Sequence, residues 1–149
     1  FECDTEEYPM LAGTSNNLHR TNTEYNYITG TDATWTSTEG SREMLTTFST
    51  LSKLYVKLGK SPGTGTSYKF TIMKNGVATD SEVTIEDGNT TGNDTVNIVE
   101  CSDFDVLSIR CIPTSGPFGS PVQTNATWSF AIKSIFPFPN SLMLTGNGI

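Results

Sequence analysis

Residues 67–85 read SYKFTIMKNGVATDSEVTI, and this stretch decides the fold class. From Tyr68 to Ile72, aromatic and aliphatic residues alternate with Lys and Thr, which is the pattern of a strand with one face in a core. Asn75 and Gly76 then form the strongest two-residue hairpin signal, because both residues tolerate the positive φ values that a type I′ turn requires. The stretch therefore predicts two antiparallel strands joined at this turn.

The same alternation recurs along the rest of the chain. Together with the hairpin it predicts about eight short strands, at residues 67–74, 77–85, 54–58, 95–100, 106–112 and 128–132, with weaker candidates at 8–13 and 24–30. Clusters of Gly, Pro, Asn, Asp and Ser separate them, and only residues 41–49 are compatible with a helical turn. This spacing predicts an all-β, antiparallel β-sandwich with a jelly-roll-like arrangement.

Composition and charge exclude several classes of partner. The chain has 149 residues, the size of one domain, and a formal net charge of −7 at pH 7. It therefore lacks the basic surface that binding to nucleic acid or to an anionic membrane requires. The uncharged run at residues 134–149 contains two prolines and is too short and polar to span a bilayer, so no membrane insertion is expected.

Three segments carry a family resemblance: LSKLYVKLGKSPGTGTSYKFTIMKNGVATDSEVTI at 51–85, TTGNDTVNIVECSDFDVLSIR at 90–110, and TWSFAIK at 127–133. Taken together they resemble β-sandwich modules of phage and environmental virus-like structural proteins. Phe104 departs from the pattern, because these modules have a glycine before the residue equivalent to Asp105. The resemblance implies a structural module of appendages, fibres or shells, similar to units that build extracellular filaments, with no catalytic residues to carry over.

Few residues qualify for catalysis or metal binding. His19 is the only histidine and stands in a polar run, whereas a Ser or Cys nucleophile needs a base beside it. Asp103 and Asp105, about 7 Å apart on one strand face, read as a solvated turn rather than a glycosidase pair. The oxygen-bearing side chains at 86–94 do not follow the EF-hand spacing and favour turn geometry instead. We therefore expect no enzyme, no metal site and no cofactor.

The cysteines, Cys3, Cys101 and Cys111, are odd in number, so they cannot all pair within one chain. If 101–105 is a tight connection between strands, Cys101 and Cys111 lie about 20 Å apart, against about 7 Å at most between the Cα atoms of a disulfide. That pair is therefore disfavoured. Two alternatives stay open: three buried thiols, or a disulfide from Cys3 to a cysteine of its own chain or of a neighbouring copy.

Three sequons and one tryptophan are the candidate sugar-related sites. The sequons begin at Asn89, Asn93 and Asn125 and fall in predicted loops or at strand ends, where a covalently attached glycan fits. Trp35 is flanked only by small polar residues, so it is the ring expected to contact a glycan if one binds; the alternative is a ring folded over the edge of the sandwich.

Residues 1–9 and 134–149 extend beyond the strand-rich body at 10–133. The second segment carries no charge and is rich in large apolar residues, so it should pack either on its own domain or on a neighbouring subunit.

These features favour a glycosylated structural subunit that is extracellular, on a cell surface or on a virion. It would link to identical subunits by exchange of a terminal segment, with Cys3 as a possible covalent lock. The alternative function is a carbohydrate-binding, lectin-like domain or a receptor-binding tail domain.

Overall fold

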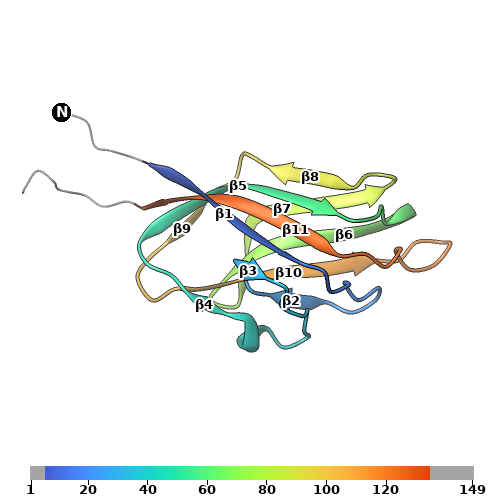
Figure 1. The fold of residues 1–149 in the computed structure, drawn as a ribbon, viewed down its shortest axis with the longest axis horizontal. Coiled ribbons are helices and arrows are strands. Elements are labelled where there is room, and N and C mark those ends of the chain that lie inside the picture. The colour runs from blue at the N-terminus through green and yellow to red at the C-terminus, as the bar shows by residue number, and fades with distance from the viewer. Residues whose placement is uncertain (1–5, 135–149) are drawn as a thin grey trace, which may run out of the picture.

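The structure, a computed structural model, describes residues 6–134 as two β-sheets packed face to face (Figure 1). These residues contain no α-helix, and so no helix among them is long and apolar enough to cross a membrane. The elements are β1 (Glu7–Thr14), β2 (Glu24–Asn26), β3 (Gly30–Thr31), the 3-10 turn η1 (Glu39–Arg42), β4 (Met44–Leu45), β5 (Ser49–Leu58), β6 (Gly63–Lys74), β7 (Val77–Asp87), β8 (Thr91–Asp94), β9 (Val99–Cys101), β10 (Val106–Thr114) and β11 (Ala126–Ser134).

Sheet A has the strand order β3-β1-β11-β5-β8, with β9 also paired to β5. Sheet B has the order β2-β10-β6-β7, with β4 also paired to β10. Every pairing is antiparallel except the short parallel contact between β1 and β3. The prediction of an antiparallel all-β sandwich is therefore confirmed.

The hairpin predicted at residues 67–85 is present as β6 and β7. Asn75 and Gly76 have φ values of 52° and 77°, the positive values that the two-residue turn requires. Tyr68, Phe70 and Ile72 point from β6 into the core and are at most 1% exposed. They meet the apolar face of β5 and of β11 from the other sheet, so the alternation in the sequence reports the buried face correctly.

The structure has eleven strands, whereas the sequence predicts about eight. The additional strands, β3, β4 and β8, are pieces of two to four residues, which are too short to show alternation. The strand expected at 95–100 is present only at its end, where Val99 and Glu100 belong to β9; residues 95–98 are not in a strand, and Val96 is 84% exposed. The Asp94 carboxylate accepts hydrogen bonds from the backbone N–H groups of Val96 and Asn97 at 3.0 Å, which turns the chain there between β8 and β9.

Both ends of the described chain lie at one end of the sandwich. β1 begins and β11 ends there, at the left of Figure 1, and Glu7 is the register partner of Lys133. The loop between β10 and β11 lies at the opposite end (Figure 1). β1 starts within the segment expected as an extension, because residues 7–9 already pair with β11.

Candidate functional site

The outward side chains of sheet A form a row across four strands. Leu11 on β1, Ser129 on β11, Tyr55 on β5 and Asn93 on β8 are successive register partners. Leu11 is 71% exposed and Tyr55 is 48% exposed. The small Ser129 lies between these two large side chains, so the row is low in the middle and high on both sides.

The next row extends the depression along β11, but it has a wall only on the β5 side, because its β1 member is a glycine. It consists of Gly13, Thr127, Lys57 and Thr91. A depression of about 520 Å³ covers both rows, with Thr127 and Ser129 on its floor. Further depressions continue it at both ends of β11, lined by Pro9 and Ala131 at one end and by Gly13 and Thr127 at the other.

We call this strip of the outer face, over Thr127, Ser129 and Ala131 and between β1 and β5, the β11 groove. Strands β1 and β5 lie on either side of β11, so the two walls are about 10 Å apart at a strand spacing of about 4.8 Å. That width takes one extended peptide or one row of apolar side chains.

An ion pair crosses the groove at the end where the described chain begins and ends. The ammonium group of Lys53 on β5 lies 2.7 Å from the carboxylate of Glu7 on β1. Because β11 lies between β1 and β5, this pair spans the central strand. The hydrogen bond and charge of Lys53 lower the pKa of Glu7, and Glu7 in turn raises the pKa of Lys53. The groove is thus bridged at this end, and the pair is exposed enough to contribute little to stability.

The edge of β1 is unsuited to accept an added strand. The Gly13 carbonyl accepts the Asp32 N–H at 2.8 Å on the side of β1 that faces away from β11. The odd-numbered residues of β1 therefore direct their backbone N–H and C=O groups away from β11, toward the edge of the sheet. Pro9 is one of these residues and has no N–H to donate. A proline at this position is a common protection against edge-to-edge pairing.

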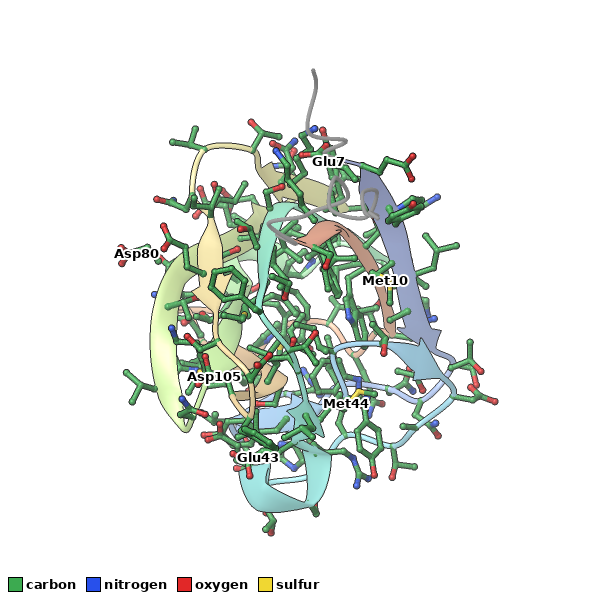
Figure 2. The ribbon with its side chains drawn as sticks, turned by 90° about the vertical axis from the view of Figure 1, so that its left-hand side faces the viewer. Glu7, Met10, Glu43, Met44, Asp80 and Asp105 are labelled. Atoms are coloured by element: carbon green, nitrogen blue, oxygen red, sulfur yellow. The ribbon has the colours of Figure 1, made fainter. Side chains whose placement is uncertain are left out.

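The two edges of sheet B are also occupied or charged. On β7, the outward N–H of Glu82 donates to the buried Asp94 carboxylate of β8 at 3.2 Å. Asp80, further along the same strand, points into solvent (Figure 2). On β2, Tyr25 exchanges both backbone hydrogen bonds with Thr36, at 2.7 and 3.1 Å. Within residues 6–134, then, the broad face of sheet A is better suited to a partner than these edges.

The three sequons differ in accessibility. Asn89 is exposed in the β7–β8 turn and donates to the Glu86 carbonyl at 3.1 Å. Asn93 is exposed too, but it lies within β8 beside Tyr55 rather than in a loop. Asn125 is partly buried, and its side-chain amide donates to the Thr14 carbonyl at 3.2 Å. Asn89 and Asn93 are therefore the accessible positions for a glycan.

Trp35 does not present its ring to solvent. It is 7% exposed, and its ring centroid lies 5.5 Å from that of Trp128 and 6.3 Å from that of Phe70. The expectation of an exposed glycan contact at this residue is corrected by its burial, because small polar neighbours in sequence do not prevent the ring from turning into the core. Tyr55, which the sequence pattern does not single out, is an exposed ring on sheet A, as is Tyr8 on β1.

Cys101 and Cys111 are buried free thiols, as the sequence geometry predicts for this pair. Burial raises the pKa of both thiols. Cys3 lies outside the described residues, as do residues 135–149.

The residues weighed for catalysis serve local turns. The His19 ring nitrogen Nδ1 accepts the backbone N–H groups of Thr21 and Asn22, at 3.2 and 3.1 Å. Asp105 accepts the Ser102 N–H at 2.8 Å, and this bond is the main cause that lowers its pKa. The described residues contain no group of three or more His, Cys, Asp or Glu side chains placed to hold a metal ion.

No model of a known protein family matches the chain, and no curated protein is significantly similar to it in sequence. The geometry of residues 6–134 therefore carries the functional argument.

Proposed function

We propose that this chain is a structural subunit that assembles with identical copies into an extracellular or virion-associated filament or appendage by exchange of a terminal segment. One observation carries the proposal: β1 and β11 are neighbours that begin and end at the same end of the sandwich. The uncharged, apolar segment 135–149 follows directly in sequence from β11, the central strand of sheet A. A connector that leaves from one end suits a heterologous, head-to-tail contact, which builds filaments rather than closed dimers.

We also propose that the sandwich is a jelly roll. If β3 and β4 are set aside and β8 and β9 are taken as one strand, eight strands remain. Their order is then first, eighth, third, sixth in sheet A and second, seventh, fourth, fifth in sheet B. This is the interleaved order that two Greek keys produce, and it supports the resemblance to virus-like structural modules.

The test compares the full chain with two truncated forms. One lacks residues 1–6, which leaves β1 intact, and the other lacks residues 135–149. Light scattering after size exclusion and electron microscopy would show polymers of the full chain and their loss in at least one truncated form. If the full chain stays monomeric at every concentration and both truncated forms behave like it, the proposal fails.

A carbohydrate-binding domain is the second candidate function, and Tyr55 favours it. Its half-exposed ring lies in one row with Ser129 and Asn93. A ring on which a sugar could stack therefore lies next to two polar side chains. Binding on a glycan array that is lost in Tyr55→Ala and kept in Trp35→Phe would support this candidate. If no glycan on the array binds, carbohydrate binding is ruled out as the function.

A further inference from the structure

We infer that the β11 groove is the surface that receives residues 135–149 of a neighbouring copy. This inference rests on the proposed assembly function and names both the donor segment and its receiving surface. The two have matching chemistry over most of their length, since the segment has no charged residue and the groove is walled by Leu11 and Tyr55 above small side chains, with Lys57 as the one charged residue that lines this depression. The apolar residues of the segment are Ile135, Phe136, Phe138, Leu142, Met143, Leu144 and Ile149.

The dimensions of the groove and of the segment agree. The groove runs from Thr127 to Ala131, which is five residues of β11, and is therefore about 16 Å long at about 3.3 Å per residue. Fifteen extended residues span about 50 Å. The segment is thus long enough to cross from one copy to the next and still fill the groove with about five residues.

The bridged end of the groove points to a second copy rather than to the chain's own segment. Residue 135 follows Ser134 at the end where the Lys53–Glu7 ion pair crosses β11. The chain's own segment would have to reverse direction there and pass over this pair. A segment from a neighbouring copy enters from the opposite end, beside Gly13 and Thr127, where no ion pair of the described residues crosses the groove.

Strand addition is the competing route, and the edges at β1 and β7 disfavour it. Pro9 removes a donor from the outward edge of β1, and the Glu82 N–H on β7 already donates to Asp94. Side chains docking on the face of sheet A need no free backbone groups. The groove therefore accepts an apolar segment without disturbing the pairing of any strand.

Two variants matched in exposure provide the first test. Leu11→Lys places a charge in the groove wall at a residue that is 71% exposed, so the fold loses little burial. We expect it to raise the concentration at half-assembly by about tenfold or more. Val77→Lys, at a residue 66% exposed on β7 of the other sheet, is the control, and we expect a change of no more than about twofold.

Cysteine cross-linking provides a second test that does not depend on the stability of one variant. Thr127→Cys and Leu142→Cys are made in separate chains, each with Cys3→Ser, and mixed under mild oxidation. A disulfide-linked pair of chains supports the inference. A further chain carries both Thr127→Cys and Leu142→Cys. If the disulfide forms only within that single chain at low protein concentration, the inference is overturned, because the segment then covers the groove of its own chain.

The remaining outcomes separate this inference from the proposed function. Polymers that persist in Leu11→Lys and after removal of 135–149 overturn the inference but leave the assembly function standing. A full chain that never assembles overturns both. Oligosaccharide binding that is lost in Tyr55→Ala, with assembly unchanged, assigns the groove to a sugar and overturns the inference.

Discussion

The Asp94 carboxylate holds the junction between the two sheets, and its removal should measurably destabilise the fold. Asp94 is 8% exposed and accepts four hydrogen bonds. The donors are the backbone N–H of Glu82 at 3.2 Å, those of Val96 and Asn97 at 3.0 Å, and the Asn97 amide at 2.9 Å. One side chain therefore fixes β8 against β7 and closes the turn that follows.

The expected cost follows from the donors that lose their partner. Hydrogen bonds to a charged group are each worth about 1.5–3 kcal/mol, but neighbouring bonds to one group are not additive and water can replace some of them. Asp94→Ala should therefore lower the free energy of unfolding by about 2–4 kcal/mol. For a domain of this size that corresponds to a decrease in Tm of about 5–15 °C. The variant keeps the Asn93 sequon, so a change in glycosylation does not complicate the comparison.

The pH dependence gives a second readout for the same residue. Burial by itself raises the pKa of Asp94, but the hydrogen bonds from Asn97, Val96 and Glu82 outweigh it and lower the pKa in the folded state. A lowered folded pKa means stability that is present above the unfolded pKa, near 4, and lost as the pH falls through the folded value. Asp94→Asn cannot ionise, so the difference in stability between it and the wild type should shrink below about pH 4.

Urea denaturation at pH 7 and pH 3 measures both effects. Asp80→Ala is the control, since this carboxylate is exposed on the same strand, β7, and should change stability by no more than about 0.5 kcal/mol. If Asp94→Ala matches Asp80→Ala at pH 7, the hydrogen bonds to Asp94 do not hold the sheets together and the reasoning is refuted.

Three further substitutions test the packing and the backbone. Phe104 has φ 72° and is 81% exposed, so Phe104→Gly should relieve strain and stabilise by about 1 kcal/mol in thermal unfolding; a lower Tm would contradict this. In Gly92→Ala the new Cβ would lie 2.6 Å from Val83 Cγ1, so a loss of about 1–3 kcal/mol is expected in urea, and an unchanged midpoint would show that β8 shifts freely. Trp35→Ala should cost about 3–5 kcal/mol, and a nearly neutral result would show that the ring is not in the core.

The sequence predicts the long strands well because their alternation and their burial have the same cause. β6 and β7 appear where expected, since one face of each strand must be apolar to meet the other sheet. The sequence pattern fails at 95–98, where Val96 and Ile98 alternate but stay exposed. There the hydrogen bonds to Asp94 outweigh the apolar pattern, and a local carboxylate of this kind cannot be distinguished in the sequence from an ordinary turn aspartate.

The β11 groove could not be predicted because alternation identifies the face of a strand but not its neighbours. Leu11, Tyr55 and Ser129 are separated by more than forty residues at each step, and only the strand order of sheet A brings them into one row. The groove then arises from a difference in side-chain size between adjacent strands, since β11 turns the small Ser129 outward between Leu11 and Tyr55 and turns Ala131 outward beside Pro9. A central strand that met only water would gain solubility from charged outward residues. Apart from Lys133 at its end, the outward residues of β11 are small and uncharged and let another chain approach the sheet closely, which is why the groove, rather than an edge, is the surface on which assembly should be tested.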